Sequence, residues 1–128
     1  MPIKLTIDEN PEAVSKIGFF IWAAGDDFES IDNDRNRMYF IPSDDFSYVI
    51  SIFRSVYPVL NPYSGEMEQY FDACFDNYFD QENILLIISK IQTLNVTDIE
   101  VMNFLAKIVQ CLKEKMSMGT YVVVEGNQ

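Results

Sequence analysis

Apolar residues recur at intervals of three and four along much of the chain, a spacing typical of amphipathic helices. The most apolar stretch is IGFFIWAA, residues 17–24. Asn10 followed by Pro11 is a helix start, because Asn caps helices and Pro suits the first helical position. We therefore predict a buried helix from this start to Gly25. A buried strand over residues 17–24 is the alternative, because a short apolar run fits either element.

Two later segments have the same spacing and are bounded by start and stop signals. The first predicted helix of this pair begins at Ser43 or Asp44 and ends before Pro58. The second is capped by Asp80 and ends at Asn95. Both segments place their apolar residues on one face, so we expect each helix to pack against a core.

The last predicted helix is the longest. Thr97 and Glu100 have the spacing of a capping box, and Gly119 supplies a stop signal. Short runs of apolar and β-branched residues also predict strands. These strands are residues 3–7, 38–41 and 121–124.

Residues 66–79 fit two patterns. A helical stripe contains Met67, Tyr70, Phe71, Cys74, Phe75, Tyr78 and Phe79. The alternation of a strand instead directs outward Glu66, Glu68, Asp72 and Asp76. We predict a helix and keep the strand as the alternative, and in both cases the carboxylates share one exposed face. The chain as a whole, residues 1–128, is predicted to be a single helix-rich α+β domain with about five helices and a small sheet of short strands.

Acidic residues are concentrated in one part of the sequence. Residues 26–82 contain thirteen acids and three bases, whereas the remainder contains seven acids and six bases. This stretch therefore holds nearly all of the net charge of −11. Crowded carboxylates repel one another in a compact fold, so they indicate a role in solubility, cation binding or recognition of a basic partner. The pI near 4.2 argues against nucleic acid or an anionic membrane as the ligand.

The sequence offers little for catalysis. It has no histidine, which removes the commonest general base and the commonest transition-metal ligand. Its five glycines stand apart and form no phosphate-binding loop. Residues 32–36 begin like a calcium loop, but Arg37 stands at the turn glycine position and Ser43 at the final glutamate position. We therefore predict no enzyme activity, no cofactor and no metal site.

The N-terminus and the cysteines indicate the compartment. Residues 1–13 contain no basic segment leading into an apolar run, so no secretory signal is predicted. Cys74 and Cys111 occupy apolar positions in the predicted pattern, and we expect both to be reduced core thiols. These features together predict a cytoplasmic protein.

Residues 70–91, YFDACFDNYFDQENILLIISKI, resemble small bacterial immunity proteins of polymorphic or contact-dependent growth-inhibition toxin systems. The shared features are Phe71-Asp72, then Asp76-Asn77, and a polar-capped amphipathic helix after Asp80. The closing VVVEGNQ is also similar. The resemblance implies a cytosolic, non-enzymatic inhibitor that binds one cognate toxin domain, often a basic nuclease. It implies contact roles for Asp72, Asp76 and Asp80, and it specifies no fold.

Our leading hypothesis is an immunity protein whose acidic and aromatic surface covers the basic, nucleic-acid-binding surface of a toxin. Rings anchor such an interface while charges steer it. The principal predicted site residues are Glu68, Asp72, Asp76, Asp80, Glu82, Tyr70, Tyr78 and Phe79. The secondary acidic contributors are Asp26, Asp27, Asp32, Asp34, Asp44 and Asp45.

Other functions fit the same residues. An acidic face kept only for solubility would show the same charge. A small acidic secretion chaperone that holds an effector segment would share the size and acidity of this chain. A carboxylate-based enzyme or cation-binding protein would use the same side chains as ligands or acid–base groups. The sequence leaves these alternatives open.

Overall fold

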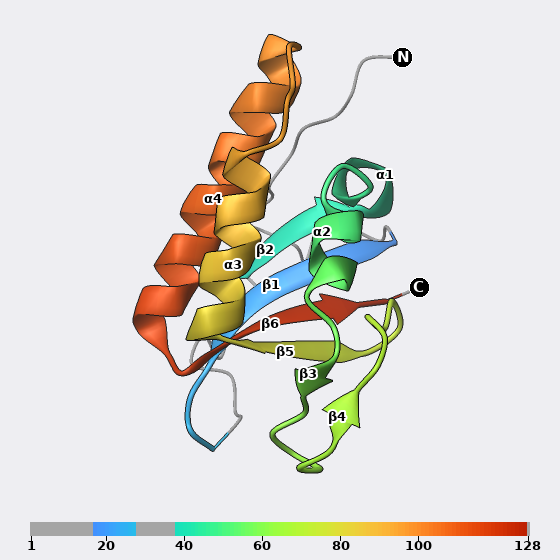
Figure 1. The fold of residues 1–128 in the computed structure, drawn as a ribbon, viewed down its shortest axis with the longest axis vertical. Helices are drawn as coiled ribbons and strands as arrows, with labels where there is room; N and C mark the ends of the chain where they lie inside the picture. Colours follow the sequence, from blue (N-terminus) through green and yellow to red (C-terminus); the bar gives the residue numbers. More distant parts are fainter. Residues whose placement is uncertain (1–16, 28–37, 128) are drawn as a thin grey trace.

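The computed structural model describes residues 17–27 and 38–127, and a four-stranded antiparallel sheet forms its centre (Figure 1). The strand order is β2-β1-β6-β5. A separate two-stranded hairpin, β3–β4, lies beside the edge strand β5. The strands are β1 (Gly18–Ala24), β2 (Tyr39–Pro42), β3 (Val59–Leu60), β4 (Met67–Glu68), β5 (Asp76–Asp80) and β6 (Tyr121–Gly126).

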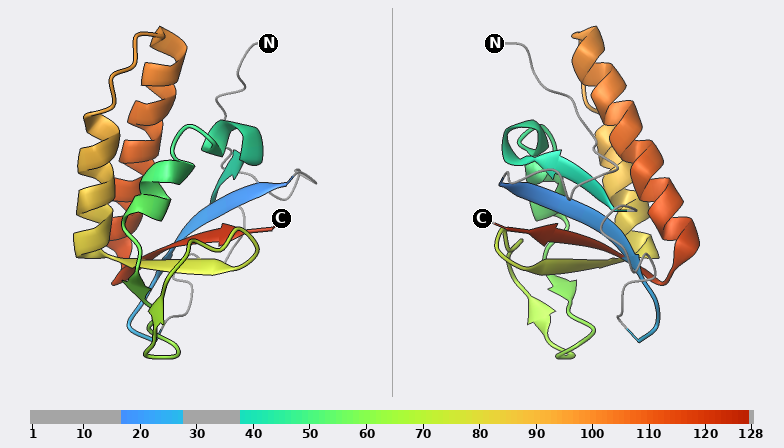
Figure 2. Two further views of the ribbon diagram at one scale, coloured as in Figure 1. Left: turned by 45° about the vertical axis from the view of Figure 1, so that its right-hand side comes forward. Right: turned by 180° about the vertical axis from the view of Figure 1, so that it is seen from behind.

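Helices cover one face of the sheet (Figures 1 and 2). The two long helices run antiparallel to each other as a hairpin. The first short helix lies over β1 and β2, and the second packs against the first of the two long helices. The helices are α1 (Ser43–Phe46), α2 (Ile50–Ser55), α3 (Gln81–Gln92) and α4 (Ile99–Met118). The described residues include no helix that is both long and apolar enough to cross a membrane.

The central strand β1 is buried on both faces. Phe19 and Ile21 point into the main core beneath the helices. Trp22 and Ala24 point into a smaller cluster on the opposite face of the sheet. Strand β1 pairs with β2 on one side and β6 on the other, so its backbone is also enclosed. Because both faces are covered, residues of either parity along this strand are apolar.

This burial explains why the predicted helix over residues 17–24 is wrong and the alternative strand is confirmed. A segment that is apolar all round fits a deeply buried helix and a strand with two covered faces equally well. The predicted helix start at Asn10 and the predicted strand at 3–7 lie outside the described residues.

The predicted helix over residues 66–79 is also wrong. The segment contains β4, a loop and β5. Its supposed apolar stripe does not form one buried face, because Met67, Tyr70 and Phe75 are exposed. As a helix, the segment would also have stacked the like charges of Glu68 and Asp72 one turn apart, which is unfavourable. The strand avoids this arrangement.

These two errors overturn the predicted fold. The mixture of helices and strands is present, but the described residues form four helices and six strands rather than a helix-rich domain with about five helices. The segment after Ser43 divides into α1 and α2 instead of forming one helix. Two segments predicted as helices, 17–24 and 66–79, instead place their backbone hydrogen bonds in strands.

Other predicted elements are confirmed. Asp80 caps α3, since its side chain accepts a hydrogen bond from the Asn83 backbone nitrogen at 2.8 Å. The long helix ends at Gly119 as predicted, although its N-cap is Asp98 rather than Thr97. Strands β2 and β6 lie within a residue or two of the predicted runs at 38–41 and 121–124.

The cysteines agree with the prediction only in part. Both are free thiols, but only Cys111 is in the core, whereas Cys74 is exposed in the loop before β5. Cys74 belongs to the segment whose helical periodicity was misleading, so its apolar position did not correspond to a buried face.

Candidate functional site

The charged residues are segregated between two regions of the molecule. We call the described strands and their loops, residues 17–27, 38–42, 56–80 and 119–127, the sheet side. The helical layer is residues 43–55 and 81–118. The sheet side contains eight carboxylates and, among the described residues, no base; the eight are Asp26, Asp27, Glu66, Glu68, Asp72, Asp76, Asp80 and Glu125.

The helical layer has a balanced charge by comparison. It contains six acids and five bases, so its net charge is −1 against −8 for the sheet side. The bases of this layer are Arg54, Lys90, Lys107, Lys113 and Lys115. A field this one-sided attracts cations to the sheet side over distances of about a Debye length.

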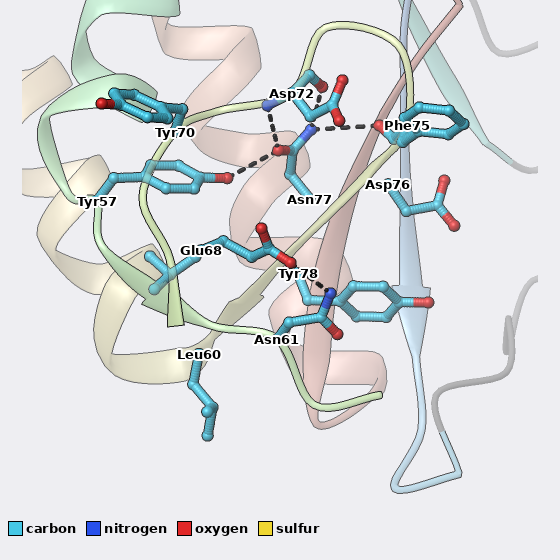
Figure 3. A pocket seen from close by; sticks show the side chains of 11 residues that line it. Tyr57, Leu60, Asn61, Glu68, Tyr70, Asp72, Phe75, Asp76, Asn77 and Tyr78 are labelled. Carbon is cyan, nitrogen blue, oxygen red and sulfur yellow. Dashed lines mark hydrogen bonds between the residues drawn. The ribbon is translucent and has the colours of Figure 1, made fainter. Parts of the chain in front are cut away.

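A pocket of about 250 Å³ lies on the sheet side between the β3–β4 hairpin and β5 (Figure 3). Three carboxylates line it: Glu68 from β4, Asp72 from the loop and Asp76 from β5. Glu68 reaches into the pocket, where the Asn61 side-chain amide donates a hydrogen bond to it at 3.0 Å. The fold therefore brings together acidic residues from three separate segments of the chain.

Asn77 fixes the upper wall of this pocket. Its side chain is buried, with 4% exposed, and it forms five hydrogen bonds. The Oδ1 atom accepts from the Tyr57 hydroxyl and from the Asp72 backbone nitrogen, both at 2.8 Å. The Nδ2 group donates to the backbone carbonyls of Asp72, Phe75 and Val124. This one amide ties the acidic loop to β6, and thus sets the position of Asp72 (Figure 3).

Tyr57 reports the electrostatics inside the pocket. Burial is the largest cause that raises the pKa of this phenol above its ordinary value, and the charges of Glu68 and then Asp72 raise it further. The phenol is therefore neutral at physiological pH and donates its proton to Asn77. The carboxylates of Glu68 and Asp72 disfavour a further negative charge on the Tyr57 oxygen. The same two charges give the pocket a negative potential, which favours a cation.

The β3–β4 turn is locked by a second asparagine. The Asn61 Oδ1 atom accepts hydrogen bonds from the backbone nitrogens of Tyr63 and Ser64. The backbone carbonyl of Asn61 accepts another from the backbone nitrogen of Gly65. Gly65 has a φ of 72°, a conformation that glycine adopts without strain. These bonds hold the hairpin rigid, so Asn61 can present its amide to Glu68.

The predicted acidic residues form two groups. Glu68, Asp72 and Asp76 surround the pocket, whereas Asp80 and Glu82 lie at the far end of β5 where α3 begins. Asp80 is also engaged as the cap of α3. Asp26 follows β1 at that same far end and accepts a hydrogen bond from the Thr120 hydroxyl.

Two of the other predicted acidic residues, Asp44 and Asp45, join neither group. Asp44 is exposed but belongs to α1 in the helical layer, and Asp45 is buried, so neither belongs to the sheet-side surface. Asp27 is exposed next to Asp26. The predicted contributors Asp32 and Asp34 lie outside the described residues.

The aromatic residues differ from the prediction. Tyr78 and Phe79 are buried, with 7% and 0% exposed, so they are not available as surface anchors. Tyr70 is exposed as anticipated, at 84%. Sequence reasoning passed over Phe75, which is 69% exposed. Tyr70 and Phe75 flank the pocket and point away from it on opposite sides (Figure 3).

Sequence reasoning also missed Asn77 and Tyr57. One signal for Asn77 was present: under the strand alternative it falls at an inward position next to apolar neighbours, and a buried amide must find hydrogen-bond partners. No signal marked Tyr57, because its role depends on contact with a residue twenty positions later.

The carboxylates are spread around the pocket. No three Asp, Glu, Cys or His side chains within residues 17–27 and 38–127 are placed to hold a metal ion. A pocket of this volume with carboxylates on several walls suits a larger cation, such as a lysine or arginine side chain. The chain matches no protein-family model, no curated protein and no solved structure.

Proposed function

We propose that this chain is a cytosolic immunity protein that binds and neutralises a cognate basic toxin domain, such as a nuclease, through its sheet side. The observation that carries the proposal is the segregation of charge, with eight carboxylates and no base among the described residues of that side. Such a surface attracts a basic partner and repels acidic proteins. A basic surface that binds nucleic acid is the natural complement.

The acidic pocket is the centre of the proposed contact. A lysine or arginine side chain of the toxin enters between the hairpin and β5 and pairs with Glu68, while Asp72 and Asp76 add their charge from the rim. An arginine fork that meets a carboxylate forms two parallel hydrogen bonds, which is the stronger and more specific arrangement. The entering side chain would leave water for a site that already carries the carboxylates of Glu68, Asp72 and Asp76.

The exposed rings extend the contact beyond the pocket. Tyr70 and Phe75 lie on opposite sides of it and offer apolar surface that nothing else in the described structure buries. Aromatic residues at the centre of an interface contribute more binding energy than their number suggests. The mechanism is steric: the bound chain occupies the nucleic-acid-binding surface of the toxin, and no bond is made or broken.

A charge-reversal experiment tests this proposal. The triple variant Glu68→Lys, Asp72→Lys, Asp76→Lys should slow association with the toxin domain encoded beside this chain's gene by more than about tenfold at low salt. The matched control reverses three exposed acids of the helical layer, Asp44, Glu100 and Glu114, and so makes the same change in net charge. Circular dichroism checks that both variants fold. Equal loss of association in the two variants would mean that only net charge matters, and the proposed surface would be wrong.

A further inference from the structure

One face of the α3–α4 hairpin exposes apolar side chains without a function in the proposed toxin contact. Along α4 they belong to a stripe with spacings of three and four that runs through Ile99, Met102, Ala106, Val109 and Lys113. Its exposed apolar members are Ile99, Met102 and Ala106, whereas Val109 is buried and Lys113 is charged. Ile99 is 64% exposed and Met102 is 46% exposed, and a contiguous exposed apolar surface can mark a site of protein association. The stripe has the spacing of a helix-packing surface, but within the described structure Ile99 and Met102 are left exposed.

A groove of about 400 Å³ runs beside this stripe. Its other wall comes from the end of α3 and the loop that follows, where Ile91, Leu94 and Val96 are apolar. Lys113 is the one charged residue that lines it, so no carboxylate faces the groove. An apolar groove beside an apolar stripe can receive the stripe of a second, identical surface.

We infer that the occupant is a second copy of this chain, docked through a two-fold axis that passes near Ala106. In such a pair the two α4 helices run antiparallel. Residues equally far before and after Ala106 then face each other, which brings Met102 of each copy towards Gln110 of the other. Ala106 at the crossing point permits a close approach because its side chain is small. A self-complementary surface of this kind is the usual basis of homodimers.

Charge favours this occupant. The antiparallel arrangement places Lys113 of one copy near the start of α4 in the other, where Asp98 is exposed and lies on the same face of the helix as Met102. Lys113 thus lies at one end of the stripe, and the exposed N-cap residue Asp98 lies just beyond the other end, so the two ends are electrostatically complementary in the antiparallel pair. Antiparallel helices also oppose their dipoles.

The charges of the described residues point to the same face. Association of two copies through their sheet sides would bring eight carboxylates against eight, which repel. The helical layers have a net charge of only −1 each. A pair joined through α4 therefore keeps the two acidic surfaces apart and leaves both pockets open. Such a dimer would bind two basic partners, one at each end.

Sedimentation analysis of the full chain over a range of concentrations tests the dimer. The wild-type chain should show a monomer–dimer equilibrium, and Met102→Glu should weaken dimerisation by about tenfold or more because it places a charge in the centre of the interface. Leu86→Glu is the matched control, since Leu86 is equally exposed at 46% but lies on the face of α3 that carries Lys90, which contacts α2 through Ser55. The control should dimerise like the wild type.

A second pair of variants tests the charge complementarity. Lys113→Glu should weaken the dimer and Lys107→Glu should not, although both make the same charge change on an exposed position of α4. A chain that stays monomeric at every concentration overturns the inference. Dimerisation that responds equally to both members of either pair also overturns it, because another face must then join the copies. These outcomes do not depend on a toxin, so they leave the proposed function to its own test.

Discussion

The Asn77 side chain offers the sharpest test of how the acidic pocket is built. Asn77→Leu keeps the branched shape and the number of side-chain heavy atoms but removes all five hydrogen bonds of the amide. The Tyr57 hydroxyl and the Asp72 backbone nitrogen then lose their acceptor, and three backbone carbonyls lose a donor. A buried polar group without a partner costs about 1–3 kcal/mol. Some of these groups can reach water, so we expect a total loss of roughly 2–5 kcal/mol in the free energy of unfolding.

A double-mutant cycle with Tyr57→Phe isolates the central bond of this network. In the wild-type background Tyr57→Phe removes the 2.8 Å hydrogen bond to Asn77 and should cost about 1 kcal/mol. In the Asn77→Leu background the hydroxyl has already lost its partner, so the same change should cost nothing or be stabilising. The expected coupling energy is thus about 1 kcal/mol or more.

Urea unfolding at constant pH, followed by circular dichroism, supplies all four free energies. The slope of the unfolding transition should be the same in the four proteins, which shows that the exposed surface on unfolding has not changed. If Tyr57→Phe costs the same in both backgrounds, the two side chains are not coupled, and the account of how Asp72 is positioned fails.

Three further predictions concern the fold and the pocket. Asp98→Ala should destabilise the chain by about 1 kcal/mol and Thr97→Ala should have almost no effect, because Asp98 rather than Thr97 caps α4; thermal unfolding distinguishes them. Gly126→Ala should cost about 1–3 kcal/mol, since a Cβ atom there would overlap the backbone oxygen of Ala73; a variant as stable as the wild type would refute this packing. Folding raises the pKa of Tyr57, so the contribution of this phenol to stability is complete below about pH 10, the pKa of a free tyrosine, and is lost at higher pH. Tyr57→Phe should therefore flatten the fall in the free energy of unfolding above about pH 10. A fall that is the same in the variant and the wild type would contradict the raised pKa.

The fold could be predicted from the sequence where local signals act alone. The Asp80 cap, the end of α4 and strand β6 depend on neighbouring residues, and all of them follow from short-range rules. The segments 17–24 and 66–79 could not be decided, since their structure depends on partners distant in the sequence. Strand β1 is enclosed by β2 and β6, and β6 lies about a hundred residues away.

The candidate site was predictable to a similar extent. The charge map placed Glu68, Asp72 and Asp76 among the eleven predicted acidic site residues, because net charge needs no knowledge of the fold, but it did not separate these three from the others. Their meeting around one pocket could not be predicted, since it depends on the hairpin that folds against β5. Which aromatic side chains are available at the surface depends on burial in the fold. The sheet encloses Tyr78, whereas Phe75, three positions earlier in the loop, is exposed.

Hydrogen–deuterium exchange of the chain with and without its toxin domain is the measurement that addresses the central claim most directly. The account predicts that the toxin protects backbone amides of β4, the loop from Tyr70 to Phe75 and the outer part of β5. Exchange of the backbone amides on the exposed face of α4 should be the same in the free and the bound chain. Protection confined to α3 and α4, with the acidic pocket unchanged, would contradict the claim that the sheet side receives the basic partner.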